Sequence, residues 1–403
     1  MDSPFAAVSL NRMRRMWMAG IVLVVLFVSV ALVMVSQKTS TPQNRTSKGI
    51  PRILIDGDSD FDAEHGVVAG MGTVSDPYLI KGWDIDASTD CRERSCTGIS
   101  VQNARVAFVI SNVTIRGGSY DHGIRLSGVK NARVESILVT SGGEGIAISD
   151  SANVSLSGSA VVGDDSGVFV ARSQNVWIYA SNISRGVQGI VVEDSVHISL
   201  IHNVLNGNSA NGLLFLHTAN STIEGNTLTE TAFRGIALFN SSNILVSQNR
   251  ILGCGEECLY VAYGGGTSLI QNEISNCAWG GVSVYGSDGN IVKGNFVAAG
   301  PSGIWLSDSS ANIIASNTVN DVTWGISVAS DSDANVVVGN TVSSSTSIGI
   351  LLNRFDDESP DHNVIQGNRV WQSGKADLLD SSGGIDNLWR LNTCEKECPL
   401  ISD

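Results

Sequence analysis

Glycine recurs along most of the chain at a nearly fixed spacing, and apolar residues recur one and three positions after it. The steps are 22 or 23 residues, apart from a first step of 25 and a last step of 24. We call these residues the anchor glycines: Gly98, Gly123, Gly145, Gly167, Gly189, Gly212, Gly235, Gly281, Gly303, Gly325 and Gly349. Cys258 fills the one slot of the column that lacks glycine. A fixed period of this length is typical of a solenoid.

Each anchor opens a predicted strand with one buried face. The first and third residues after every anchor are apolar, as in Ile304 and Leu306, whereas the residue between them varies. This alternation predicts strands, with Ile304 and Leu306 buried and residues 307–310 exposed in a turn. Three short strands fit within each period. The sequence therefore predicts an all-β solenoid, a parallel β-helix of about 12 coils.

Asparagine forms a second column, and an aliphatic residue follows it after two positions. The column contains Asn203, Asn226, Asn249, Asn272, Asn295, Asn317, Asn340 and Asn368. Asparagine tolerates a left-handed backbone, so we expect it at a bend of each coil. Stacked coil on coil, these side chains should also pair into an internal ladder.

These Gly-Ile-x-Leu and Asn-x-Val columns resemble the right-handed parallel β-helix repeat family, in its NosD-like branch, which is also described as the CASH domain. The resemblance covers about residues 98–376 and implies a right-handed β-helix. It is specific for the fold and not for the activity, because this architecture hosts many functions. We assign residues 98–379 to the repeats and residues 380–403 to a C-terminal cap.

The chain before the repeats contains a candidate membrane segment. Residues 16–36 are apolar over a length that can span a bilayer, and arginines in the basic tail of residues 1–15 predict a cytoplasmic N-terminus. We interpret this segment as a single-pass signal anchor that leaves the β-helix on the extracellular face; a cleaved signal peptide is the alternative. Residues 37–50 read as a flexible linker.

Residues 51–97 form a predicted N-terminal cap. The stretch GTVSDPY, followed by GWDI, resembles the entry segment of membrane-anchored β-helix surface proteins of archaea. Asp56, Asp58, Asp60 and Asp62 alternate as in a calcium loop. Phe61 and Val67 replace the glycine and glutamate that such a loop requires, so a solvated acidic turn is the preferred interpretation and calcium is the alternative. No other cofactor is predicted.

The net charge of −14 argues against nucleic acid as a partner. The cysteines suit an oxidising, extracellular location. We predict the disulfides Cys91–Cys96, Cys254–Cys277 and Cys394–Cys398, with Cys258 free; Cys254 and Cys277 occupy equivalent positions on adjacent coils, within disulfide range. Asn-x-Ser/Thr glycosylation motifs occur at Asn44, Asn112, Asn153, Asn182, Asn220 and Asn240.

Acidic residues give one candidate for chemistry. Glu144, Asp164 and Asp165 fall on adjacent coils, and glycoside hydrolysis uses paired carboxylates as acid and base. The GDDSG run at residues 163–167 resembles that of polygalacturonase-type hydrolases, which implies catalytic roles for Asp164 and Asp165, with Glu144 replacing an aspartate. The next coil, RGVQG, lacks the expected histidine, and no Arg-Ile-Lys triplet follows.

Aromatic residues at outward or turn positions give a second candidate, because such rings can stack on sugar faces. The predicted ligand-binding residues are Phe169, Tyr260, Trp279, Trp305 and Trp324; packing beneath neighbouring loops is the alternative role. The NosD resemblance also implies copper-site assembly, but the six histidines form no column.

Two functions follow from these candidates. The first is a membrane-anchored extracellular protein that binds glycans or cell-envelope components without catalysis. The second is a polysaccharide hydrolase or lyase that uses Glu144, Asp164 and Asp165. Copper-site assembly ranks third. No residue is predicted to bind a metal.

Overall fold

The computed structural model describes residues 52–87, 97–117, 122–140, 143–355 and 358–396. Within these ranges the chain forms strands and turns, and its helical structure is one short 3-10 helix, η1 (Asp58–Asp60). No helix of the described residues is long and apolar enough to cross a membrane. The predicted tail, anchor and linker, residues 1–15, 16–36 and 37–50, lie outside the described residues.

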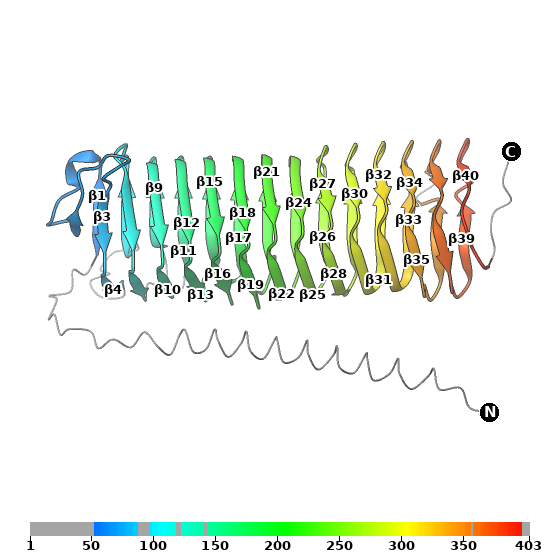
Figure 1. The fold of residues 1–403 in the computed structure, drawn as a ribbon, viewed down its shortest axis with the longest axis horizontal. Helices are drawn as coiled ribbons and strands as arrows, with labels where there is room; N and C mark the ends of the chain where they lie inside the picture. Colours follow the sequence, from blue (N-terminus) through cyan, green and yellow to red (C-terminus); the bar gives the residue numbers. More distant parts are fainter. Residues whose placement is uncertain (1–51, 88–96, 118–121, 141–142, 356–357, 397–403) are drawn as a thin grey trace, which may run out of the picture. The chain divides into compact units, whose positions relative to one another are not determined.

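The strands stack along one axis in about 12 turns, and a typical turn contributes one strand to each of three faces (Figure 1). The strands at the anchors, together with β1 and β39 at the two ends, form the anchor face: β1 (Ile53–Asp56), β5 (Ile99–Gln102), β8 (His122–Ser127), β11 (Glu144–Ser149), β14 (Ser166–Ala171), β17 (Gln188–Glu193), β20 (Leu213–Leu216), β23 (Ile236–Phe239), β26 (Glu257–Ala262), β29 (Gly280–Tyr285), β31 (Phe296–Ser307), β33 (Thr318–Ala329), β36 (Ile348–Asn353) and β39 (Ala376–Ser381).

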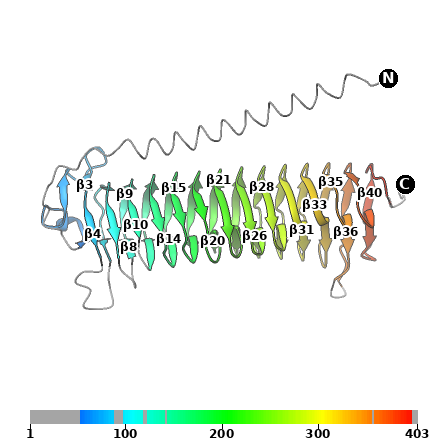
Figure 2. The same ribbon diagram turned by 90° about the horizontal axis from the view of Figure 1, so that it is seen from below.

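The second face is a separate sheet of β3 (Tyr78–Lys81), β6 (Phe108–Ser111), β9 (Lys130–Glu135), β12 (Ala152–Ser157), β15 (Gln174–Tyr179), β18 (Val196–Ile201), β21 (Ala219–Glu224), β24 (Ser242–Ser247), β27 (Ser268–Ile270), β30 (Ile291–Lys293), β32 (Ile313–Ala315), β34 (Val336–Val338), β37 (Val364–Gln366) and β40 (Leu388–Arg390). One more strand, β2 (Val67–Ala69), pairs antiparallel with β3. Figure 2 shows the stack from the perpendicular direction.

The third face contains the strands that precede the next anchor: β4 (Asp84–Asp86), β7 (Thr114–Arg116), β10 (Leu138–Thr140), β13 (Ala160–Val162), β16 (Asn182–Ser184), β19 (Val204–Asn206), β22 (Thr227–Thr231), β25 (Arg250–Cys254), β28 (Glu273–Cys277), β35 (Thr341–Ser343) and β38 (Arg369–Trp371). The long strands β31 and β33 run through the third face and the anchor face without a break.

The predicted apolar columns form the core. In register, Ile304 lies between Val282 and Ile326, and all three side chains are fully buried, as is Leu306. The strands pair in parallel throughout the stack, with β2 the exception. The prediction of an all-β parallel solenoid is confirmed. A charged or polar residue in either column would be enclosed by apolar neighbours on the turns before and after it.

The anchor position requires glycine because it leaves no room for a side chain. A Cβ atom on Gly303 would lie 2.4 Å from the carbonyl oxygen of Gly325 and 2.4 Å from a methyl group of Val319. Other anchors, such as Gly123 and Gly167, meet the next turn equally closely. The column of glycines therefore records a close approach of successive turns rather than a need for unusual backbone angles.

The predicted asparagine ladder is confirmed. Asn249 is buried, donates from Nδ2 to Asn272 Oδ1 at 3.0 Å, and accepts at Oδ1 from Asn226 Nδ2 at 3.0 Å. The left-handed residue is the one before the ladder asparagine, as at His202 and Gln248, and not the asparagine itself. The asparagine is selected here for its hydrogen bonds and not for its backbone.

Residues 307–310 are not an exposed turn as expected, since Ser307 and Ser309 are buried. Ser309 belongs to a stack of serines in which each hydroxyl accepts a backbone N–H from the preceding turn. Ser287 N donates to Ser309 Oγ at 3.1 Å, and Ser309 N donates to Ser332 Oγ at 3.1 Å. The hydroxyls satisfy buried amides at a corner where the chain changes direction.

Segments expected to be caps also contribute strands. In the N-terminal segment β1, β3 and β4 pair with β5, β6 and β7. The ring of Phe61 is buried against Tyr78 and Phe108, at centroid distances of 5.1 and 5.3 Å, and closes this end of the core. At the other end β40 pairs with β37, and the Trp389 indole N–H donates to Asp380 Oδ2 at 3.1 Å.

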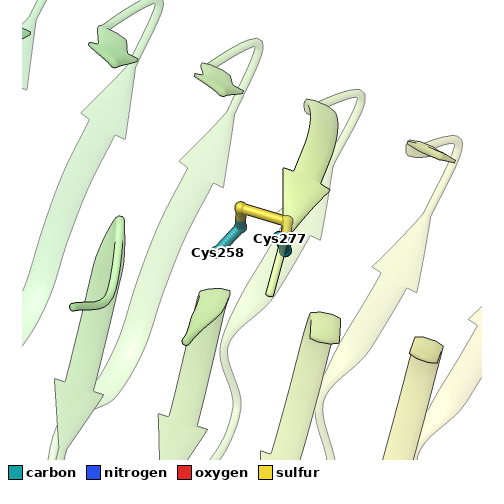
Figure 3. Close-up of a disulfide and its surroundings, with 2 residues drawn as sticks. All are labelled: Cys258 and Cys277. Atoms are coloured by element: carbon teal, nitrogen blue, oxygen red, sulfur yellow. A yellow bond between two sulfur atoms is a disulfide. The ribbon is translucent and has the colours of Figure 1, made fainter. Parts of the chain in front are cut away.

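The predicted disulfide Cys254–Cys277 is wrong. These residues are in register on β25 and β28, as expected, but Cys277 is bonded to Cys258, with a Cα–Cα distance of 5.6 Å, while Cys254 is a buried free thiol (Figure 3). An anchor side chain points toward the next turn. A Cβ on Gly235 would lie 3.1 Å from Cys254 Sγ. Cys258 and Cys277 occupy the equivalent two positions one turn later, so their side chains approach each other in the same way.

The disulfide thus occupies the one anchor position without glycine. The Cys258 side chain, which would otherwise lie too close to Cys277, is covalently bonded to it. Cys394 is disulfide-bonded, while its predicted partner Cys398, and the predicted pair Cys91–Cys96, lie outside the described residues.

Candidate functional site

A groove of about 370 Å³ crosses the outer surface of the anchor face at β26, β29, β31, β33 and β36. Ligand pockets commonly begin near this volume. Its lining residues are Glu257, Trp279, Gly280, Ser283, Ser302, Trp305, Trp324, Ser327, Leu351 and Asn353. We call it the tryptophan groove. Five strands at a spacing of about 4.8 Å give it a length of roughly 19 Å along the stack.

The groove follows from the size of the outward side chains in two columns. One column runs in register from Glu257 through Gly280 and Ser302 to Trp324. The second runs from Tyr260 through Ser283, Trp305 and Ser327 to Leu351. Small residues therefore lie between large ones on neighbouring turns, and the surface is hollowed where the small side chains stand.

Three tryptophans surround this hollow. Trp279 and Trp324 are 61% and 43% exposed, and Trp305 is half-buried. Covering an exposed indole ring with a ligand removes apolar surface from water, which is favourable. The flat faces of the rings offer apolar contact to a ligand that has an apolar face of its own. Hydroxyls of Ser283, Ser302 and Ser327 supply polar groups nearby.

A charged cluster closes the end of the groove at Glu257. The Arg234 Nε–H donates to Glu257 Oε2 at 2.8 Å, and an Arg234 terminal nitrogen lies 2.8 Å from Glu256 Oε2. The guanidinium also lies over the Tyr260 ring, 4.4 Å from its centroid. Burial raises the pKa of the Tyr260 hydroxyl. These contacts hold the Glu257 carboxylate in place beside the groove.

The predicted aromatic ligand residues separate into two groups. Trp279, Trp305 and Trp324 come together in the groove, and Tyr260 lies beside it under Arg234. Phe169 lies four turns before Tyr260 in the same column, and it does not line the groove.

The predicted catalytic carboxylates do not share one surface. The Asp164 side chain is buried, the neighbouring Asp165 side chain is exposed, and Glu144 is half-buried with Oε2 3.0 Å from His122 Nδ1. Asp164 Oδ2 lies inward, 2.7 Å from where a Cβ on Gly145 would stand. A glycosidase needs its two carboxyl groups on either side of one bond, and this arrangement does not provide that.

Metal ligands are also dispersed. Among the described residues, no three His, Cys, Asp or Glu side chains lie close enough together to hold a metal ion. His217 lies near Asp194, and His122 lies near Glu144. These two pairs are on different turns and do not combine into one site. In the acidic turn, Asp58 Oδ1 accepts backbone N–H groups of Arg105 and Val106. The described side chains therefore do not form a copper centre.

The glycosylation motifs lie in the first part of the stack. All five motif asparagines within the described residues are exposed: Asn112, Asn153, Asn182, Asn220 and Asn240. Asn44 lies outside the described residues. No further Asn-x-Ser/Thr motif follows Asn240 in the sequence, and the tryptophan groove begins at Glu257. The motif asparagines therefore lie on turns that precede those of the groove.

A second depression, of about 800 Å³, follows the third face near residues 112–204. It is shallower than the tryptophan groove, and its lining consists largely of small side chains such as Ser136, Gly158 and Ala180, with no Phe, Tyr or Trp ring. It therefore lacks the aromatic surface that the tryptophan groove offers.

Two family profiles match the sequence. One, described as "Periplasmic copper-binding protein (NosD)", matches residues 99–278, and the other, "Right handed beta helix region", matches residues 234–393. The chain belongs to the right-handed parallel β-helix repeat family. No curated protein matches the sequence.

Solved structures share the β-helix. A mutant of the periplasmic alginate epimerase AlgG is similar with a TM-score of 0.56 and 13% identity, over 79% of this chain and 85% of that chain. PfbA, a surface adhesin of Streptococcus pneumoniae, is similar with a TM-score of 0.51 and 12% identity, over 66% of this chain and 83% of that chain. At these identities the likeness shows the fold alone.

Sequence reasoning did not find Glu257, Arg234 or the small residues of the groove as parts of a site. The groove could have been recognised from the outward columns of the β-helix. In these columns Gly280 follows Glu257, and Ser283 lies between Tyr260 and Trp305, on successive turns. Reading those columns across turns, rather than along each strand, would have shown a hollow between Glu257 and Trp305.

Proposed function

We propose that this β-helix protein binds glycans or other saccharide components of a cell envelope through the tryptophan groove, without transforming them. The observation that carries the proposal is the convergence of Trp279, Trp305 and Trp324 on one hollow with serine hydroxyls between them. A saccharide presents C–H groups on its ring faces and hydroxyls at its edges. The groove offers aromatic surface for the former and hydrogen-bonding groups for the latter.

The length of the groove favours an oligomer over a single sugar. Trp279 and Trp324 come from β-helix turns that are two strand spacings apart, and the half-buried Trp305 lies on the turn between them. A linear saccharide that runs along the stack can contact all three rings in succession. Each ring would add contact area, so affinity should rise with chain length up to the length of the groove.

The N-terminal sequence supports a place at the cell surface. The apolar stretch of residues 16–36, preceded by arginines, is suited to a single-pass anchor with the β-helix outside the cell. The proposal is therefore a membrane-anchored extracellular protein, attached to the membrane by that segment, whose partners are glycans or envelope proteins and not nucleic acid.

A glycan array probed with the purified full-length protein tests the binding function. Trp305→Ala and Trp324→Ala should each weaken binding about tenfold or more, since aromatic side chains that a ligand covers contribute about 1.4 kcal/mol or more to such contacts. Trp177→Ala is the matched control, because Trp177 is 41% exposed but lies on β15, on another face. Loss of binding in the control alone, or no binding to any glycan, would refute the proposal.

A reducing-sugar assay on the same glycans tests the enzymatic alternative. We expect no release of reducing ends by the protein, or by the variant with Glu144→Gln, Asp164→Asn and Asp165→Asn. Because Asp164 is enclosed, its substitution should affect folding more than chemistry. Turnover that disappears in Asp165→Asn alone would establish a polysaccharide hydrolase or lyase.

A further inference from the structure

Among the described residues that line the tryptophan groove, one carries a charge. Of the ten lining residues, Glu257 is the only one with an ionisable side chain. Its carboxylate is nearly buried, and its Oε2 receives the Arg234 Nε–H. Oε1 accepts no hydrogen bond from the described residues. One carboxylate oxygen at the end of the groove is therefore available to a ligand.

The neighbouring cation does not reverse this charge. Arg234 lies between the carboxylates of Glu256 and Glu257, with a contact of 2.8 Å to each. One positive and two negative groups leave this cluster with a net charge of −1. Arg354 follows the lining residue Asn353, but it does not line the groove and is engaged in an interaction of its own. None of the described residues that line the groove is a lysine or an arginine.

We propose that the tryptophan groove selects uncharged saccharides and excludes uronates and other anionic ones, and that Glu257 is the residue that sets this discrimination. This rests on the proposed function. A ligand carboxylate near Glu257 would be repelled by the Glu257 carboxylate. Arg234 neutralises this carboxylate incompletely, because it also contacts Glu256. At contact distances in a partly desolvated site, such repulsion is worth about tenfold to hundredfold in affinity.

The same geometry favours a neutral ligand positively. A saccharide hydroxyl can donate to Glu257 Oε1, and hydrogen bonds to an ionised acceptor are stronger than neutral ones. An ionised carboxyl group at the same place has no proton to donate. The glutamate therefore discriminates in both directions, by attracting a hydroxyl and by repelling a carboxylate.

An array of matched hexasaccharides tests this selection with the full-length protein. β-1,4-linked glucose, galactose and mannose hexamers are printed beside their C6-carboxylate counterparts, so that each pair differs only at C6. The protein should bind the neutral member at least about tenfold more tightly in each pair that binds at all. The preference should shrink as salt is raised, since the charges are partly exposed to screening.

Two substitutions assign the effect to a residue. Glu257→Gln keeps an oxygen for the Arg234 Nε–H and removes the charge, and it should reduce the preference to within about threefold. Glu256→Gln is the matched control: it removes the same charge from the same arginine but lies outside the lining, so it should reduce the preference by clearly less than Glu257→Gln does. Thermal unfolding of each variant reports on its folding.

The outcomes separate this inference from the proposed function. Absence of binding to every member of the array overturns the proposed function and this inference with it. Binding in which the acidic members equal or exceed the neutral ones overturns the selection and leaves glycan binding standing. Equal effects of the two glutamine substitutions would refute the role of Glu257. If Glu257→Gln unfolds, the ratio in the unmutated protein and its dependence on salt still decide the selection.

Discussion

Asn249 is the most informative place to perturb the ladder inside the β-helix. Its side chain is almost fully buried and makes four hydrogen bonds, to Asn226 N and Nδ2, to Ile223 O and to Asn272 Oδ1, all between 2.9 and 3.0 Å. Leucine has the same branching and no polar atom, so Asn249→Leu removes these bonds and leaves little room for a water molecule to replace them.

The magnitude follows from the groups that lose their partners. The Asn226 backbone N–H is left buried without an acceptor, at a cost of about 1–3 kcal/mol. The three other bonds contribute about 0.5–1 kcal/mol each. Asn226 Nδ2 still donates to Leu200 O, and Asn272 Oδ1 still accepts from Asn249 N. Neither atom is therefore left without a hydrogen-bond partner. We expect a loss of about 3–6 kcal/mol in the free energy of unfolding.

Urea denaturation followed by tryptophan fluorescence measures this loss, and hydrogen exchange at the Asn226 amide measures it locally, because stacked repeats need not unfold in one step. Asn243→Gly is the control on the same turn. It removes one exposed contact of 3.3 Å to Asn220, and glycine tolerates the left-handed backbone of that position. Equal costs for the two variants, or unchanged exchange at Asn226, would refute the role of the buried ladder.

Four further predictions concern an anchor glycine, the Cys254 thiol and the N-terminal segment. Gly303→Ala should destabilise the protein by about 2–3 kcal/mol because its Cβ meets the Gly325 carbonyl oxygen at 2.4 Å, whereas Ser302→Ala should change stability by less than about 0.5 kcal/mol; urea midpoints decide this. Burial raises the pKa of the Cys254 thiol from 9.0 to about 12, so iodoacetamide should modify it only after unfolding, as mass spectrometry would show. The unfolded thiol ionises first, so stability should fall as pH rises from 9 toward 12, by an amount that Cys254→Ala removes; an equal fall in that variant contradicts the assignment. Protease added outside intact cells should digest the β-helix, and full protection would reverse the proposed orientation.

The sequence was sufficient for the β-helix because its determinants are local and repeated. The apolar residues after each anchor, such as Ile304 and Leu306, sample the same buried environment on every turn. The asparagine ladder was predictable for the same reason, since equivalent residues on successive turns must stack. Repetition turns a weak preference at one position into a clear pattern.

Features that depend on where a side chain points, rather than on the spacing of residues along the chain, were not predictable in the same way. Cys254 and Cys277 stack as expected, but bonding depends on where the side chains point, and the anchor position of Cys258 directs its sulfur toward the next turn. Ser307 and Ser309 were expected to face solvent because serine is common in turns, yet hydroxyls there satisfy buried amides.

The candidate site was partly visible in the sequence. Trp279, Trp305 and Trp324 were singled out as outward aromatics, but Phe169 satisfied the same criterion and lies elsewhere. What distinguishes Trp305 is that serines, Ser283 and Ser327, lie beside it on both adjacent turns, which becomes apparent once register is known. Glu257 gave no signal by itself, because one glutamate before an anchor resembles any other solvated carboxylate.

Tryptophan footprinting tests the central claim most directly. N-bromosuccinimide oxidises exposed indoles, and Trp324 and Trp177 are almost equally exposed, at 43% and 41%, on different faces. With a neutral hexasaccharide that the protein binds, mass spectrometry should show Trp279 and Trp324 protected and Trp177 oxidised as before. Protection of Trp177, or unchanged oxidation of Trp279 and Trp324 at saturating saccharide, would contradict binding in the tryptophan groove.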